Sequence, residues 1–447
     1  MRQGVAIFAA AAVVAASLPY LREHDETLTA LLSKAKIAVT GPSADEEQAR
    51  EPLDPPALTD LDLANIDDRR DVITAPAHGK RTAELTLDPV YQRSAVSILR
   101  RGEVYEGAVV MSDVRDGRML AWASYNRGRA RDLAVEATYP TASIMKVVTG
   151  AALVEAGVPL NQKFCYNGGL HGIEMRHLEP NEDRDKYCAT LGRAMGRSLN
   201  VVFARLADQH LDQNKLGSAA KRLGFGLQIP FDVPVQPSMV ELPDDRLEFA
   251  RTAAGFWHTT LSPFQATNMA QAVANGGVMV RSRIVDRIVD EEGEVLWDAP
   301  KERQEFRRVL DERTAWSVAR MMEQTVANGT SFKTFHDRAG RPFLPDIRIA
   351  GKTGTLHDKK TDTLITWWVG FAPADKPEVA LAALVTNRGP WHIKGTHVAA
   401  DMLRIYFADQ DKKGVRYPPG FRDLKRRRDN EKKEAEGEAD GDKTASR

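Results

Sequence analysis

The stretch Ser143-Ile144-Met145-Lys146 opens an apolar run that continues to Val154. The run is apolar on every side, which is typical of a buried helix rather than a surface helix. Lys146 is the only charged residue inside it, and burying an unpaired charge is costly. Since residues three apart lie on the same helix face, the Lys146 amine can reach the Ser143 hydroxyl. A desolvated lysine tends towards its neutral form, so Lys146 is a candidate base for a Ser143 nucleophile.

The flanks of this helix favour the same interpretation. Thr141 is a suitable N-cap residue, and Gly157 is suited to ending the helix. Ser143 then falls in the first turn, where backbone N–H groups have no helical partner and the helix dipole favours negative charge. Its N–H is a candidate donor to an oxygen that becomes negative. Because S-x-x-K is common by chance, its meaning depends on the rest of the chain.

Composition excludes one broad class of function. The 447 residues include 62 basic and 62 acidic residues, and the balance argues against a nucleic-acid-binding protein. Hydrophobic residues make up 43% of the chain, which is enough for a large core. The length suggests roughly two or three domains, and no repeat of about 20–50 residues is apparent.

The two ends of the chain differ in composition from the middle. Residues 4–18 form an uncharged apolar run, and we interpret residues 1–21 as a membrane anchor or, slightly less favoured, a cleaved signal peptide. Either would put the rest of the chain outside the cytoplasm. Residues 22–82 include an acidic, proline-bearing stretch and are expected to be a linker. Residues 411–447 are highly charged and are expected to be a disordered tail.

The chain contains two cysteines, Cys165 and Cys188. An even count in an extracytoplasmic chain favours one disulfide, which would contribute about 3 kcal/mol. The alternative is two reduced, buried thiols. His171 and His177 lie between the cysteines, but no histidine or cysteine pair has the spacing of metal ligands, so no metal site is expected.

Strand-like segments lie at two places that are far apart in the sequence. Residues 108–111 and 119–123 flank Asp116-Gly117, a dipeptide typical of hairpin turns. Three more strand-like segments and a last helix follow much later, at residues 346–355, 364–371, 379–385 and 397–407. The sequence thus predicts an α+β fold with one antiparallel sheet of about five strands flanked by helices. A large helical insertion is expected between strands 2 and 3.

Two further short motifs follow the first one. Ser198-x-Asn200 supplies a hydroxyl and an amide, and Lys352-Thr353-Gly354-Thr355 ends a strand-like run. The glycine would let another backbone approach closely, and the lysine and threonines can hold a carboxylate. Each motif is weak alone, but the order S-x-x-K, S-x-N, K-T-G is the set found in class A β-lactamases and penicillin-binding proteins.

With these motifs, the sequence resembles the transpeptidase domain of class B, monofunctional penicillin-binding proteins. The resemblance spans roughly residues 83–408 and includes Ser262-Pro263-Phe264-Gln265-Ala266 and Trp368-Val369-Gly370-Phe371. It implies a transpeptidase domain over residues 83–410. One departure is Ala142, because the family usually has glycine immediately before the serine.

The resemblance implies a catalytic role for five residues. Ser143 would be the acylated nucleophile and Lys146 its base. Ser198 and Asn200 would lie across the cleft, where they relay protons and bind the substrate amide. Lys352 would orient Ser198 and the substrate.

The resemblance also implies how the substrate is held. Thr353 and Thr355, on either side of Gly354, would bind the terminal carboxylate of the substrate. The backbone N–H groups of Ser143 and Thr355 would form the oxyanion hole. Strict strand alternation would point Thr353 away from Lys352, which the sequence leaves unresolved.

The expected function is that of a membrane-tethered, extracytoplasmic serine D,D-transpeptidase. Its expected ligands are peptidoglycan stem peptides and β-lactams, without metal or cofactor, and other cell-wall synthesis proteins at the membrane stay open as partners. The enzymatic alternatives are a D,D-carboxypeptidase and, less favoured, a β-lactamase. A β-lactamase needs a base that activates water, and Glu241 is the only carboxylate between the second and third motifs that we consider a candidate for it. The non-enzymatic alternative is a penicillin sensor or an inactive divisome scaffold.

Overall fold

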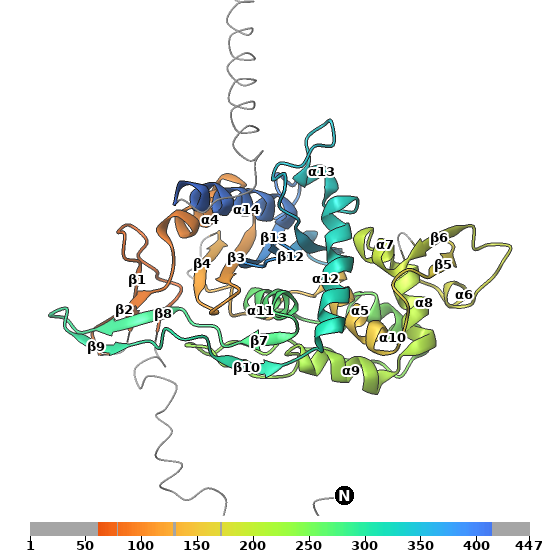
Figure 1. Ribbon diagram of the computed structural model, residues 1–447, viewed down its shortest axis with the longest axis horizontal. Coiled ribbons are helices and arrows are strands. Elements are labelled where there is room, and N and C mark those ends of the chain that lie inside the picture. The colour runs from red at the N-terminus through yellow and green to blue at the C-terminus, as the bar shows by residue number, and fades with distance from the viewer. Residues whose placement is uncertain (1–60, 78, 128–130, 170–171, 414–447) are drawn as a thin grey trace, which may run out of the picture. The chain divides into compact units, whose positions relative to one another are not determined.

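The structure is a computed structural model that describes residues 61–77, 79–127, 131–169 and 172–413 (Figure 1). Its central feature is a five-stranded sheet in which every neighbouring pair is antiparallel, in the order β11-β12-β13-β3-β4. The strands are β3 (Glu106–Asp113), β4 (Met119–Asn126), β11 (Ala350–Asp358), β12 (Thr363–Ala372) and β13 (Val379–Arg388). The hairpin of β3 and β4 joins the later strands because β3 pairs with β13. The two distant strand groups thus form one sheet, as predicted.

Helices cover both faces of this sheet. On one face lie α4 (Pro89–Arg101) and α14 (Gly395–Lys412), and on the other lies α11 (Pro263–Ala274) (Figure 1). Because successive side chains of a strand point to opposite faces, Val109 joins the core under α4 and α14, whereas Val110 joins the core under α11. The central strands are therefore continuous apolar runs rather than alternating ones.

The predicted helical insertion lies between β4 and β11. It holds α11 and most of the remaining helices: α5 (Met145–Glu155), α6 (Met175–Leu178), α7 (Leu191–Gly196), α8 (Asn200–His210), α9 (Gln213–Arg222), α10 (Arg246–Ala253), α12 (Glu312–Ala327) and α13 (Phe332–Phe335). It also holds short strands: β5 (Lys163–Tyr166), β6 (Tyr187–Thr190), β7 (Val278–Val280), β8 (Val285–Val289), β9 (Val295–Asp298) and β10 (Glu305–Arg308).

The helix that carries Lys146 is buried as predicted, but its start differs from the prediction. Ser143 lies in a short 3₁₀ turn, η1 (Ala142–Ile144), and α5 follows directly. Thr141 does not cap this helix with its side chain. Its hydroxyl instead lies 2.7 Å from the hydroxyl of Thr259, so a tertiary hydrogen bond replaces the expected local one.

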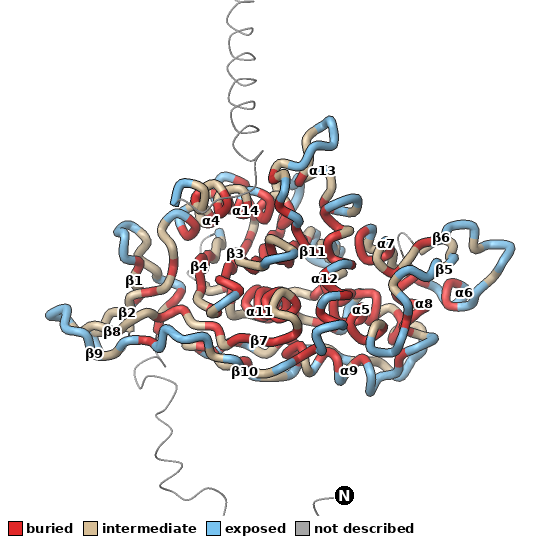
Figure 2. Tube along the Cα trace, viewed as in Figure 1, coloured by how far each residue is buried: buried red, intermediate tan, exposed pale blue. Residues whose placement is uncertain are grey.

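The structure differs from the predicted linker 22–82 from residue 61 onward. Leu61 and Ile73 are buried. A four-stranded sheet with the order β1-β2-β8-β9 contains β1 (Thr74–Ala77) and β2 (Arg81–Leu85), and buried and half-buried positions occur along both strands (Figure 2). Since β2 pairs with β8, about 200 residues later, local composition does not reveal this strand.

The remaining predictions about the ends fall mostly on residues that the structure does not describe. The anchor or signal peptide, residues 1–21, lies wholly outside the described residues. The predicted tail 411–447 begins too early, because residues 411 and 412 are the end of α14, and its residues from 414 onward also lie outside the described residues. Among the described residues, none of the helices combines the length and the apolar character that crossing a membrane requires.

Candidate active site

The three motifs meet in one cleft, although they are far apart in the sequence. Ser143 comes from η1, Ser198 and Asn200 from the start of α8, and Thr353 from the edge strand β11. The cleft has a volume of about 270 Å³. Its lining residues are Ser143, Ser198, Asn200, Thr330, Thr353, Gly354, Thr355, Thr366, Trp367, Lys394 and Thr396.

Lys146 lies fully buried beneath this cleft and contacts three oxygens. Its Nζ is 2.9 Å from Ser143 Oγ and 2.8 Å from Asn200 Oδ1, and it donates to the carbonyl of Ala254. The amide and carbonyl oxygens can only accept, so they take the two N–H groups of a neutral amine. The lone pair is then left for the Ser143 hydroxyl, which is the arrangement a general base needs.

Burial also favours the neutral form of Lys146. Desolvation, and secondarily the charge of Lys352, holds the pKa of Lys146 well below its usual range. Burial lowers the pKa of Lys352 to about 7. Both lysines are fully buried.

Lys352 links the second motif to the third. Its Nζ donates to Ser198 Oγ over 3.0 Å and to the carbonyl of Thr353 over 2.7 Å. Ser198 has a φ of 56°, in the left-handed region that a serine rarely adopts. Such backbone strain is characteristic of functional sites, and here it accompanies a hydroxyl that lines the cleft and is held by the lysine.

The glycine of the third motif lets β11 lie close to the serine turn. A Cβ at Gly354 would come within 3.1 Å of the carbonyl of Thr141 and 3.2 Å of Ile144. Thr353 and Thr355 both line the cleft although Lys352 reaches Ser198. The question that strand alternation left open is thus resolved: both threonines reach the cleft, and Thr353 Oγ1 lies 2.5 Å from the hydroxyl of Thr330.

Several residues of the cleft were missed by the motif reasoning. Thr330 follows α12, Thr366 and Trp367 belong to β12, and Lys394 immediately precedes α14. None belongs to a recognisable short pattern, because each is brought to the cleft by tertiary packing. Trp367 could have been found from the sequence, because it directly precedes Trp368-Val369-Gly370-Phe371, the stretch that resembles the family.

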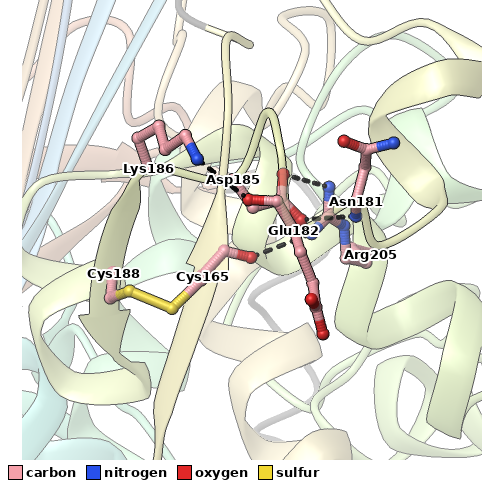
Figure 3. The surroundings of a disulfide bond; sticks show 7 residues. All are labelled: Cys165, Asn181, Glu182, Asp185, Lys186, Cys188 and Arg205. Carbon is pink, nitrogen blue, oxygen red and sulfur yellow. Dashed lines mark hydrogen bonds and ion pairs between the residues drawn. A yellow bond between two sulfur atoms is a disulfide. The ribbon is translucent and has the colours of Figure 1, made fainter.

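The predicted disulfide is present and joins Cys165 to Cys188. The disulfide cross-links the paired strands β5 and β6. We call residues 163–169 and 172–190, which include this pair, the disulfide lobe. Arg205 of α8 anchors the lobe, since its guanidinium binds Asp185 at 2.7 Å and the carbonyl of Cys165 at 2.9 Å (Figure 3). The side chains of Arg205 and Asp185 are both buried, and His177 of the lobe is buried as well.

No carboxylate is among the described residues that line the cleft. Glu241 is exposed, and its backbone N–H donates to the carbonyl of His258, so it belongs to a loop outside the cleft lining. Within the described ranges, no group of three or more potential metal ligands occurs. The Ser143–Lys146 and Ser198–Lys352 contacts suit these side chains to proton transfer and to acyl transfer at Ser143.

The sequence matches the penicillin-binding protein transpeptidase domain family over residues 107–405. This match covers more than half of the chain, so the chain belongs to that family. Solved structures agree with this assignment. The D,D-transpeptidase domain of a peptidoglycan glycosyltransferase from Eggerthella lenta superimposes with a TM-score of 0.61 at 25% identity, covering 73% of this chain and 83% of that one.

Other relatives are consistent with the family. The chain is 28% identical over 285 residues to the stage V sporulation protein D of Bacillus subtilis, covering 61% of this chain and 42% of that protein. It is 25% identical over 302 residues to the peptidoglycan D,D-transpeptidase PbpA of Mycobacterium tuberculosis, with coverages of 63% and 57%. The chain thus spans about half the length of these curated relatives. The crystal structure of PBPA from Mycobacterium tuberculosis has the same fold, with a TM-score of 0.60 at 23% identity over 73% of this chain and 80% of that one.

Proposed function

We propose that this chain is a peptidoglycan D,D-transpeptidase. Ser143 Oγ attacks the carbonyl of the D-Ala-D-Ala bond of one stem peptide, and D-alanine leaves. The amine of a neighbouring stem peptide then takes the acyl group from Ser143, and the serine hydroxyl is restored. The observation that carries this proposal is the contact set of Lys146, which leaves one lone pair for the Ser143 hydroxyl.

Proton transfer to the leaving group is supported by the second lysine. The proton that Lys146 takes from Ser143 has to reach the nitrogen of the departing D-alanine. Ser198 lies on the opposite wall of the cleft, and its hydroxyl is bound by Lys352. A hydroxyl can accept and donate at once, so Ser198 is suited to relaying this proton.

A hydrogen bond from the indole of Trp367 supports the proposed oxyanion hole. In a 3₁₀ turn the N–H of Ser143 would bind the carbonyl of Pro140. That carbonyl instead accepts a hydrogen bond of 3.0 Å from Trp367 Nε1. The Ser143 N–H is thus suited to binding the oxygen of the tetrahedral intermediate, together with the N–H of Thr355 on the edge strand.

The terminal carboxylate of the stem peptide would bind at the β11 side of the cleft. Thr353 and Thr355 offer hydroxyls there, as expected from the motif. Lys394 adds a positive charge to the same lining. A carboxylate binds a charged lysine more strongly than it binds a neutral hydroxyl. Lys394 should therefore contribute to carboxylate binding, although the motifs did not indicate it.

Localisation belongs to the same proposal. The substrate is outside the cytoplasm, and the disulfide between Cys165 and Cys188 fits an oxidising compartment. We propose that residues 1–21 attach the domain to the cell membrane or direct its export. We propose that the domain associates there with other cell-wall synthesis proteins.

Intact-mass measurement over time tests the proposal. Penicillin should add one penicilloyl group to the wild-type chain and none to Ser143→Ala. The adduct should persist for many minutes after free drug is removed, because none of the described residues that line the cleft has a carboxylate to activate water. Turnover within seconds would favour a β-lactamase, and labelling of Ser143→Ala would overturn the assignment of the nucleophile.

A second assay separates the two peptide reactions. A synthetic stem peptide ending in D-Ala-D-Ala should release D-alanine, and an added amine acceptor should appear in the product. Hydrolysis alone, at any concentration of acceptor, would show a D,D-carboxypeptidase instead.

A further inference from the structure

A second cavity adjoins the catalytic cleft. Its volume is about 280 Å³, and it shares Ser198 and Asn200 with the cleft. It lies on the side of these residues that faces the disulfide lobe. Its lining residues are Tyr166, Gly168, Gly169, Tyr187, Arg197, Ser198, Leu199, Asn200 and Val201. A chain that occupies the cleft can therefore continue into this cavity past Ser198.

Two tyrosines form one wall of this cavity. Tyr166 of β5 and Tyr187 of β6 are direct cross-strand partners, and their ring centroids are 6.1 Å apart. The neighbouring partners in the register are Cys165 and Cys188, so the disulfide fixes the strand positions that carry both rings. Tyr187 is 66% exposed, a large exposed fraction for an aromatic side chain.

The cavity also contains a positive charge without a protein partner. Arg197 lies between α7 and Ser198, it is exposed, and its guanidinium has no ion pair or hydrogen bond among the described residues. In the lobe, the carboxylate of Asp185 is occupied by Arg205. A guanidinium presents a planar fork of donors that matches a carboxylate, so an unpaired one at a cavity favours an anionic ligand.

We infer that this cavity is a second subsite for the stem peptide that acylates Ser143, and that Arg197 binds a carboxylate of that peptide. This carboxylate is not the terminal one, which would lie at Thr353 and Thr355 on the opposite wall. The tyrosine rings flank the aliphatic part of the same residue, because their apolar faces can cover methylene groups while their hydroxyls stay in water. The inference rests on the proposed function and adds a specificity for peptides with an internal free carboxylate.

The test compares two synthetic stem peptides that end in D-Ala-D-Ala. One has its internal carboxylate free, and in the other that carboxylate is amidated. The measured quantity is the ratio of kcat/KM for D-alanine release between the two peptides, with the full chain. In wild type we expect the free carboxylate to be preferred about tenfold, as for a hydrogen bond to a charged group. In Arg197→Gln the ratio should fall to about one, and Arg197→Lys should give an intermediate ratio.

Arg193→Gln is the matched control. Arg193 is an exposed arginine on α7, four residues before Arg197, and does not line the cavity. Its replacement should leave the tenfold ratio and the melting temperature unchanged. The melting temperature of Arg197→Gln is measured as well, and Arg197→Lys decides the question if Arg197→Gln does not fold.

The outcomes separate this inference from the proposed function. If penicillin acylates the wild-type chain and peptide is consumed, but the ratio is the same in Arg197→Gln as in wild type, the subsite is overturned and the transpeptidase proposal stands. A wild-type ratio of about one overturns the subsite in the same way. If penicillin does not acylate Ser143 at all, the proposed function fails, and the subsite fails with it.

Discussion

The catalytic cleft and the disulfide lobe are neighbours that are stabilised in different ways. The cleft is built on two fully buried lysines, Lys146 and Lys352, whose hydrogen-bond partners come from four separate segments of the chain. The lobe buries few apolar side chains and is held by one disulfide and one buried ion pair, Arg205–Asp185. Both regions bury charged residues, but only in the lobe is the charge neutralised by an opposite charge.

This difference separates a device for chemistry from a device for stability. Burial without a counter-charge lowers the pKa of Lys146, at a cost to folding, and this suits the lysine to the proposed role of base. A paired buried arginine keeps its charge and fixes the position of a small hairpin. Small, loop-rich units commonly depend on such cross-links because their hydrophobic core is small. Changes in the cleft should therefore affect rates, and changes in the lobe should affect stability.

The largest expected effect is on acylation in Lys146→Arg. Arginine keeps the positive charge but stays protonated, so it cannot take the proton of Ser143. We expect the rate of acylation by penicillin to fall about 10²–10⁴-fold, the contribution of general-base catalysis. Stopped-flow or quenched mass measurements give the rate. A unique melting transition in the variant shows that it is folded, and near wild-type acylation in this state would make Lys146 structural.

The next effect concerns stability and lies in the lobe. Asp185→Asn removes the carboxylate and leaves Arg205 buried without a counter-charge. Breaking a buried ion pair in this way should cost about 3–5 kcal/mol of the free energy of unfolding. Denaturant unfolding measures this loss, and Asp183→Asn, at an exposed position two residues earlier, should change it by less than about 1 kcal/mol. Equal losses in the two variants would contradict the role of the pair.

The same carboxylate predicts how the lobe responds to acid. Burial alone would raise the pKa of Asp185, but hydrogen bonds from Arg205 and the Asn181 backbone lower it to about 2. The folded state thus binds this proton less readily than the unfolded state does. The stability from the ion pair is present above the ordinary carboxyl pKa of 3.8 and is lost as pH falls towards about 2. Asp185→Asn should abolish this part of the pH dependence of unfolding.

Much of this comparison could be predicted from the sequence, and the rest could not for a physical reason. The order of the three motifs predicted that Ser143, Lys146 and Lys352 belong to one site, and the structure brings them together. Hydrophobic patterning indicated the five-stranded sheet. The anchor of the lobe, Arg205, was missed because its partners are chosen by tertiary packing rather than by spacing. The strand β1 (Thr74–Ala77) was missed for a similar reason, since it is stabilised by pairing with β2 in a sheet completed from the insertion.

A smaller effect should separate the two lysines of the cleft. Burial first, and the charge of Lys352 second, lowers the pKa of Lys146. Lys352→Met removes that charge, so the pKa of Lys146 should rise and the acid limb of acylation should move up by as much as about 1 pH unit. The rate of acylation by penicillin is measured across pH for this purpose. Lys333→Met, at an exposed lysine on α13, should leave the limb in place, and an unmoved limb in Lys352→Met would contradict the coupling.

The smallest expected effect concerns Ala142, where the sequence departs from the glycine that is usual in the family. Its φ is 47°, in the left-handed region, which costs a residue with a Cβ about 1–2 kcal/mol. Glycine removes that strain but loses about 0.5–1 kcal/mol more chain entropy on folding than alanine does. Ala142→Gly should therefore stabilise the chain by at most about 1.5 kcal/mol, seen as a small rise in melting temperature. Ala151→Gly, inside α5, should lower it, because glycine in a helix interior is unfavourable. If Ala142→Gly also lowers the melting temperature, the alanine side chain contributes packing at the serine turn that outweighs its backbone strain.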